Sequence, residues 1–170
     1  MSVERPLRAV YPGSFDPVTR GHEDIARRSL RLADELVVGV AHTATQYKTG
    51  LFPVEERIEL LEEVFAGEPR IRVIAFEGLL VDFCRAQGAA MVVRGLRAVS
   101  DFEYELQMAQ MNQELGGDFE TCFLAPDVQY SFLSASLVRE VARLGGDVST
   151  FVSHPVLRRL QAHQREDRDG

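Results

Sequence analysis

Short apolar segments alternate with amphipathic segments along most of the chain. The apolar segments predict β-strands, because each is short and bounded by polar residues or glycine. They cover residues 8–11, 36–41, 71–76, 90–93 and 119–124. Between them, apolar residues recur every three or four positions, which is the spacing of an amphipathic helix. This alternation predicts an α/β protein in which a parallel five-stranded sheet carries helices on both faces.

The predicted helices carry recognisable start and stop residues. Pro53 suits the first position of a helix over residues 53–65, and Gly88 ends the helix before the fourth strand. Asp101 can cap a long helix that runs to about residue 115. Further helices are expected over residues 21–32, 134–144, 147–151 and 155–162.

Length and charge limit the possible classes of function. The 170 residues fit one Rossmann-like domain over residues 1–163, followed by a charged segment, 164–170, that we expect to fray. The 19 Lys and Arg residues stand against 26 Asp and Glu residues, so the net charge is −7. Nucleic-acid-binding proteins normally present a basic surface. We therefore expect no nucleic-acid partner, although a few well-placed cations suffice for one small phosphorylated ligand.

The sequence also argues against a membrane or export function. The longest apolar runs, such as residues 36–41 and 89–93, are too short to span a bilayer. The first residues form no apolar signal region. Cys84 and Cys122 lie in apolar stretches and fit buried free thiols of a reducing compartment. We therefore expect a cytoplasmic protein without a membrane segment.

Four loops expected at the carboxyl-terminal edge of the sheet carry side chains that suit phosphate binding. Ligands bind at this edge in open parallel sheets. Thr19-Arg20-Gly21-His22 begins a predicted helix, whose free N–H groups attract phosphate. A lone histidine there more often caps the helix, but the loop directly upstream, at residues 13–17, favours a phosphate contact. In chain order, the four loops contribute Ser14 and His22, Lys48, Arg94 and Arg97, and residues 130–136.

Four ordered blocks of sequence point to one family. They are Tyr11-Pro12-Gly13-Ser14-Phe15-Asp16-Pro17 with Gly21-His22, Arg94-Gly95-Leu96-Arg97, Asp101-Phe102-Glu103-Tyr104-Glu105 with the segment 107–112, and Tyr130-Ser131-Phe132 leading to Ser134, Ser136 and Arg139. Together they resemble the bacterial phosphopantetheine adenylyltransferase family, within the nucleotidyltransferase superfamily that carries a T/H-x-G-H motif. The similarity runs in order from about residue 8 to residue 160.

The resemblance implies an enzyme that transfers the adenylyl group of ATP to 4′-phosphopantetheine, giving dephospho-coenzyme A and pyrophosphate. The acceptor phosphate would attack the α-phosphorus in line, without a covalent enzyme intermediate. A phosphomonoester has its second pKa near ~6, so this nucleophile is largely ionised at neutral pH and needs no general base. The protein then has to align the reactants and stabilise charge on the transferring group.

The same resemblance assigns roles to individual residues. His22 would stabilise the transition state at the α-phosphate, and Ser14 would touch both ATP and the acceptor. Mg²⁺ would be held mainly by phosphates and water, without direct protein ligands. The acceptor-binding residues would be Ser14, Lys48, Leu80 and Arg94. The ATP-binding residues would be Ser14, Phe15, His22, Gly95, Leu96, Arg97, Glu105, Tyr130, Ser131, Phe132, Leu133, Ser134, Ala135 and Ser136.

The resemblance further implies a homohexamer and feedback inhibition by coenzyme A. The helix over residues 102–115 is the candidate contact surface between subunits. The sequence departs from the family pattern in two places. Relatives commonly have Asn-Pro shortly before the lysine of the 42–50 loop, and Ala135 replaces a usual serine. Because Ala135 lacks a hydroxyl, we expect weaker ATP contacts that backbone donors partly replace.

Several site residues also have plainer interpretations. Lys48 can be a solvated lysine, and Arg97 can simply pair with Asp101. Glu105 can lie on a solvated helix face, and Ser134 can be only an N-cap.

Other functions remain open at this point. The same fold could adenylylate another phosphate, such as nicotinamide mononucleotide or glycerol phosphate, although the block over residues 94–112 fits the pantetheine subgroup better. A non-catalytic nucleotide-binding module would be favoured by loss of His22 or Arg94, and both are present. A scaffold without a ligand would not explain four phosphate-binding loops at one sheet edge.

Overall fold

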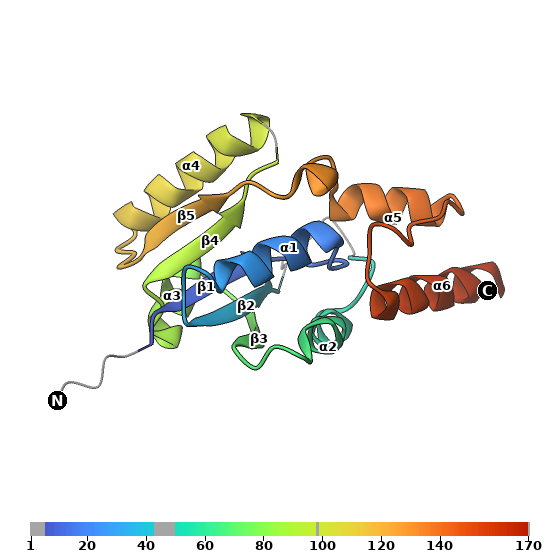
Figure 1. The fold of residues 1–170 in the computed structure, drawn as a ribbon, viewed down its shortest axis with the longest axis horizontal. Coiled ribbons are helices and arrows are strands. Elements are labelled where there is room, and N and C mark those ends of the chain that lie inside the picture. Colours follow the sequence, from blue (N-terminus) through green and yellow to red (C-terminus); the bar gives the residue numbers. More distant parts are fainter. Residues whose placement is uncertain (1–5, 43–49, 98, 170) are drawn as a thin grey trace.

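The computed structural model describes residues 6–42, 50–97 and 99–169, and its centre is a five-stranded sheet. The strand order is β3-β2-β1-β4-β5, and every neighbouring pair is parallel (Figure 1). All five predicted strands are confirmed. Their bounds are β1 Arg8–Gly13, β2 Glu35–Ala41, β3 Ile71–Phe76, β4 Met91–Gly95 and β5 Glu120–Leu124.

Six α-helices and one short 3-10 helix connect the strands in the described part of the chain. Their bounds are α1 Arg20–Ser29, α2 Val54–Phe65, α3 Leu80–Gln87, α4 Val99–Glu114, η1 Val128–Tyr130, α5 Ala135–Arg143 and α6 His154–Asp169. None of the described helices is long and apolar enough to cross a membrane.

Four helix predictions need correction. Helix α1 ends at Ser29, before the expected end at residue 32, and residues 30–32 form turns. Residues 147–151 form turns, because the Asp147 carboxylate accepts the N–H of Ser149 at 2.9 Å and so competes with helical hydrogen bonding. Helix α6 continues through Asp169, beyond the expected end at residue 162. Its Gln164 side chain donates to the carbonyl of Ala142 in α5. The expected fraying of residues 164–170 stays a prediction. Helix α4 begins before Asp101, so this residue lies in the first turn instead of capping it.

The sheet is buried on both faces by two separate groups of apolar side chains. The larger group joins one face to α1, α2, α5 and α6, and the smaller joins the other face to α3. Along β1, Ala9 and Tyr11 belong to the first group and Val10 to the second, as strand alternation requires. Helix α4 packs at the far edge, where Phe102 meets Phe123 of β5 edge to face at 6.0 Å (Figure 1).

Both cysteines are free thiols, as predicted. Cys84 is fully buried in the smaller core, and burial raises the pKa of its thiol to about 12. Cys122 is only half-buried.

The chain order creates a crevice between the ends of β1 and β4. The chain leaves β1 toward β2 and β3 and then crosses back to β4 on the other side. The β1–β4 ladder is short, with Ala9 opposite Met91 and Val10 opposite Val92. Beyond it the loops that follow β1 and β4 diverge, and this reversal point is where open parallel sheets bind ligands.

Candidate active site

A cavity of about 310 Å³ opens at this reversal point. Five pieces of the chain form it: the end of β1 and its loop, the first turn of α1, the end of β4, the first part of α4, and the segment from Pro126 to Ser136. Residues far apart in the sequence therefore meet, as the loop analysis predicted. The lining includes Ser14, Phe15, His22, Arg94, Gly95, Arg97, Glu105, Tyr130, Leu133, Ser134, Ala135 and Ser136.

His22 is held by a reciprocal capping arrangement at the start of α1. The backbone N–H of Thr19 donates to His22 Nδ1 at 3.0 Å, and the N–H of His22 donates to the Thr19 hydroxyl at 3.4 Å. Because Nδ1 accepts a hydrogen bond, the neutral ring carries its proton on Nε2. Phe15 packs edge to face against the ring at 5.1 Å between centroids. The imidazole is thus a fixed Nε2–H donor in the wall of the cavity.

The electrostatics of the cavity keep this imidazole neutral. Burial, followed by repulsion from Arg97 and Arg94, lowers the pKa of His22 from 6.5 to about 4. At neutral pH, the positive potential of the cavity therefore comes from the two arginines, and His22 contributes a dipole. Burial also raises the pKa of Tyr11, against the opposing effect of the same two arginines, so its hydroxyl stays protonated.

Arg94 joins three parts of the site. Its guanidinium grips the Glu105 carboxylate through two hydrogen bonds of 2.6 and 2.5 Å and donates to the carbonyl of Pro12 at 2.8 Å. Burial disfavours its charge, but the hydrogen bonds and attraction of Glu105 raise its pKa above the ordinary value. The interpretation of Glu105 as a solvated helix residue is therefore wrong, because its side chain is 12% exposed and faces β4 through this pair.

Arg97 makes the ion pair that the sequence allowed and a further contact that it did not suggest. Its Nε lies 3.3 Å from a carboxylate oxygen of Asp101, one helical turn away. Its Nη1 donates to the carbonyl of Leu133 at 3.0 Å. Arg97 therefore ties the loop after β4 to the segment that precedes α5.

Two helix N-termini point into the same cavity. Thr19 caps α1, and Ser134 caps α5 by accepting the N–H of Leu137 at 3.1 Å. The N-cap interpretation of Ser134 is thus confirmed. Each helix start offers free N–H groups and a partial positive charge, which favour phosphate. Ala135 and Ser136 form the first turn of α5 and line the cavity directly.

Comparison with known proteins identifies the family. Residues 10–141 match the family model described as cytidylyltransferase-like. Over 153 residues, the chain is 57% identical to the phosphopantetheine adenylyltransferase of Azoarcus sp. (strain BH72), which covers 90% of this chain and 93% of that protein. The chain belongs to the phosphopantetheine adenylyltransferase family. It is also 54% identical over 161 residues to the family member of Thiobacillus denitrificans, covering 95% of this chain and 99% of that protein.

Solved structures agree on the fold alone. A putative nicotinate-nucleotide adenylyltransferase from Vibrio parahaemolyticus aligns with a TM-score of 0.67 over 94% of this chain and 96% of that chain, at 16% identity. A lipopolysaccharide core biosynthesis protein from Thermoplasma volcanium aligns with a TM-score of 0.55 over 72% of this chain and 98% of that chain, at 22% identity. Both show that the overall fold of this chain also occurs in distantly related proteins.

Not every residue predicted by the resemblance to this family lines the cavity. Leu80 packs at the edge of the smaller core, and the Leu96 N–H donates to the carbonyl of Leu124 at 2.9 Å. Ser131 donates to the carbonyl of Val128, and Phe132 is exposed and packs against Phe151. Lys48 lies outside the described residues.

The structure adds lining residues that had no assigned role. Tyr11, Thr19 and Asp101 face the cavity. Tyr11 lies in the first sequence block, and Thr19 lies in the adjoining motif that contains His22. Their membership of these motifs was the signal that could have placed them in the cavity wall. Asp101 was expected as a helix cap or as an ion-pair partner of Arg97, not as a residue of the cavity wall.

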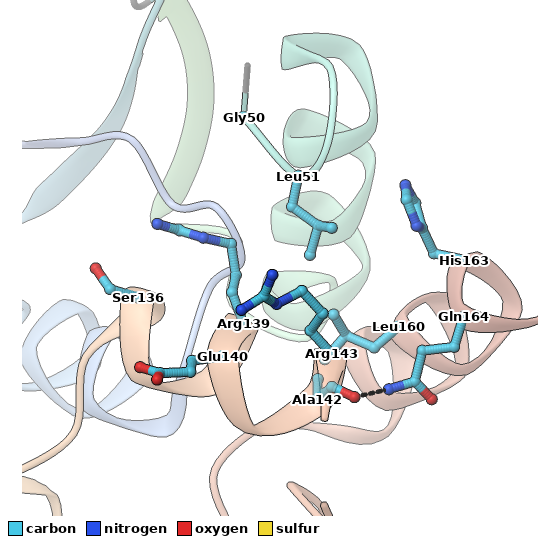
Figure 2. A pocket seen from close by; sticks show the side chains of 10 residues that line it. All are labelled: Gly50, Leu51, Ser136, Arg139, Glu140, Ala142, Arg143, Leu160, His163 and Gln164. Carbon is cyan, nitrogen blue, oxygen red and sulfur yellow. Dashed lines mark hydrogen bonds between the residues drawn. The ribbon is translucent and has the colours of Figure 1, made fainter. Parts of the chain in front are cut away.

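A second and larger cavity, of about 670 Å³, adjoins the first at Ser136. It lies between α5 and α6, and Figure 2 shows that Arg139 and Arg143 of α5 line it together with Leu51. Arg139 also donates to the backbone carbonyl of Asp16 in the loop after β1. The smaller cavity is the candidate active site because the histidine, the two inward arginines and both helix N-termini converge there.

Proposed function

We propose that this chain transfers the adenylyl group of ATP to 4′-phosphopantetheine, giving dephospho-coenzyme A and pyrophosphate. The observation that carries the proposal is the convergence of a fixed neutral His22, Arg94, Arg97 and two helix N-termini on one cavity at the reversal point. These groups suit a reaction in which every reacting centre is a phosphate. The sequence similarity to phosphopantetheine adenylyltransferases over nearly the whole chain supports this choice of acceptor.

In this proposal His22 donates its Nε2–H to the α-phosphate as charge develops on it. Its orientation is already set by the Thr19 N–H before substrate binds, so little reorganisation is needed. Removal of such a preorganised donor typically lowers turnover by roughly 10²–10³. The acceptor phosphate acts directly as nucleophile, and the loss of pyrophosphate needs no covalent link to the enzyme.

The two substrates would approach from different sides. The first turn of α5, with Ser134 and Ser136, would bind phosphates of ATP through N–H and hydroxyl groups. Ser14 and Arg94 would meet the acceptor phosphate, because both flank the crevice between β1 and β4. Lys48 remains a predicted acceptor contact, and Leu80 a predicted contact of the pantetheine arm.

The proposal includes Mg²⁺ held by ATP phosphates and water. The carboxylates that line the cavity, Asp101 and Glu105, are already paired with Arg97 and Arg94. Within the described residues, no group of three or more His, Cys, Asp or Glu side chains could hold a metal ion. When bound, the ion would neutralise part of the triphosphate charge.

We also propose a cytoplasmic homohexamer that is inhibited by coenzyme A. Support for assembly comes from α4, where large apolar side chains are exposed on a single helix. Tyr104 is 62% exposed and Met111 is 55% exposed, and Phe102 and Met108 are also open. An exposed apolar helix of this kind suits a contact between subunits.

Pyrophosphate release tests the proposed reaction. The enzyme, ATP and Mg²⁺ are incubated with 4′-phosphopantetheine, and in parallel with nicotinamide mononucleotide or glycerol phosphate. We expect release with 4′-phosphopantetheine alone, loss of about 10²-fold or more in His22→Ala, and little change in His154→Ala, whose exposed side chain lies outside the cavity. Release with another acceptor only would reassign the substrate. Binding of ATP without release with any acceptor would leave a non-catalytic nucleotide-binding module.

A further inference from the structure

Arg57 is a buried cation directly behind the loop that follows β1. It lies on α2 and is 6% exposed. Its Nη1 donates to the carbonyl of Ser14 at 2.7 Å and lies 3.5 Å from the carbonyl of Ala41, the last residue of β2. The side chain therefore joins the end of β2 to the loop that follows β1, at Ser14, which lines the active-site cavity. Arg57 itself lines neither the active-site cavity nor the larger cavity next to it.

Three arginines from three different elements hold the end of β1 and the loop after it through the backbone. They donate to alternate carbonyls, so that Arg94 binds Pro12, Arg57 binds Ser14 and Arg139 binds Asp16. This arrangement fixes the backbone of the loop and surrounds it with positive charge.

Arg57 differs from the other two in its lack of a counterion. Arg94 pairs with Glu105, and Arg139 has a carboxylate oxygen of Asp16 at 3.9 Å. Within the described chain, Arg57 pairs with no carboxylate, and its buried Nε has no hydrogen-bond acceptor. An uncompensated buried charge is costly, and only carbonyl dipoles offset it here. Its field is therefore available to an anion on the other side of Ser14.

We propose that Arg57 is a positioning residue that makes the acceptor site selective for a phosphorylated ligand. It does so by holding Ser14 in place and by supplying an uncompensated positive charge behind it. This inference rests on the proposed function, because it takes the acceptor phosphate to lie against Ser14. The chemical prediction is specific: Arg57 should favour the phosphorylated acceptor over the same molecule without its phosphate.

The test compares two ligands that differ only in the phosphate. Dissociation constants for 4′-phosphopantetheine and for pantetheine are measured by calorimetry on the wild-type protein and on Arg57→Gln, Arg57→Met and Arg57→Lys. Arg8→Gln is the matched control. Like Arg57, Arg8 donates to a backbone carbonyl near β1, in this case that of Gln87. It lies at the other end of the strand, away from the active-site cavity. Wild-type pyrophosphate release is measured first, so that failure of the proposed reaction is seen separately.

We expect Arg57→Gln and Arg57→Met to weaken 4′-phosphopantetheine binding by about tenfold, the effect of one nearby charge in a partly buried site. Pantetheine binding should change by less than about twofold. Arg57→Lys keeps the charge and should retain most of the preference, and Arg8→Gln should retain all of it. Equal loss for both ligands in folded protein would reduce Arg57 to a structural residue. A lysine variant that behaves like the neutral ones would also overturn the proposal.

Discussion

The lowered pKa of His22 should make the protein lose stability in mild acid. In the unfolded chain this imidazole takes up a proton below pH 6.5, whereas in the folded protein it resists protonation until about pH 4. Above pH 6.5 both states are neutral, so the residue has no effect on stability there. Each pKa unit corresponds to about 1.36 kcal/mol, so the free energy of unfolding should fall by about 2 kcal/mol between pH 7 and pH 5. Because the ring faces the cavity, this figure is an upper value.

Urea denaturation at a series of pH values isolates this contribution. Carboxylates also titrate in this range, so the informative quantity is the difference between wild type and His22→Gln. The difference in the free energy of unfolding between the two proteins should change steadily as the pH falls below 6.5 and should stay constant above pH 6.5. His154→Gln, altered at an exposed position at the start of α6, is the control. Parallel curves for wild type and His22→Gln would refute the reasoning, as would an NMR titration that places the His22 pKa near 6.5.

Three further substitutions test other parts of the site. Thr19→Ala should lower the free energy of unfolding by about 1 kcal/mol through loss of the N-cap, and Thr19→Ser should restore it in urea denaturation. Glu105→Gln should lower the thermal midpoint by leaving the half-buried Arg94 without its counterion, and added pyrophosphate should raise the midpoint of this variant by more than it raises that of the wild type. Ala135→Ser should tighten ATP binding about two- to fivefold in calorimetry, because one hydroxyl is added at the start of α5, and an unchanged dissociation constant would show that backbone donors already suffice.

The strands were predictable from sequence because each lies in a sheet covered on both faces and is therefore apolar. Two strands continue two residues beyond their expected ends: β4 was expected to end at residue 93 and continues to Gly95, and β1 was expected to end at residue 11 and continues to Gly13. Proline and glycine normally indicate a loop. Here Pro12 pairs with Gly39 on one side, whereas the β1–β4 ladder ends at Val10. The missing N–H of Pro12 therefore costs no ladder bond toward β4, and its carbonyl is free to bind Arg94.

Most of the described residues of the cavity were predictable as members of three loops, those after the first, fourth and fifth strands, but their interactions were not. The fourth predicted loop, with Lys48, lies outside the described residues. Strand topology places these loops at one edge, which a motif can indicate. The partner of Glu105 depends on which face of α4 meets β4, and the sequence of that helix offers acids on more than one face. The role of Arg57 was equally hidden, because an arginine within a charged helix start reads as solvated until its burial is known.

The arrangement of charges explains how a neutral histidine can suit this chemistry. Arg94 and Arg97 are held by protein carboxylates and carbonyls, so they set the potential of the cavity while His22 and the helix starts offer free N–H groups. In the proposed reaction the nucleophile is already an anion, so His22 has no proton to remove. The acid side of the kcat/KM profile should then follow the acceptor phosphate, with an apparent pKa near ~6. A difluoromethylene phosphonate analogue, whose second pKa is lower, should move that limb to lower pH. A limb that stayed in place with the analogue would belong to a group other than the acceptor phosphate, and the assignment of the limb to the nucleophile would be wrong.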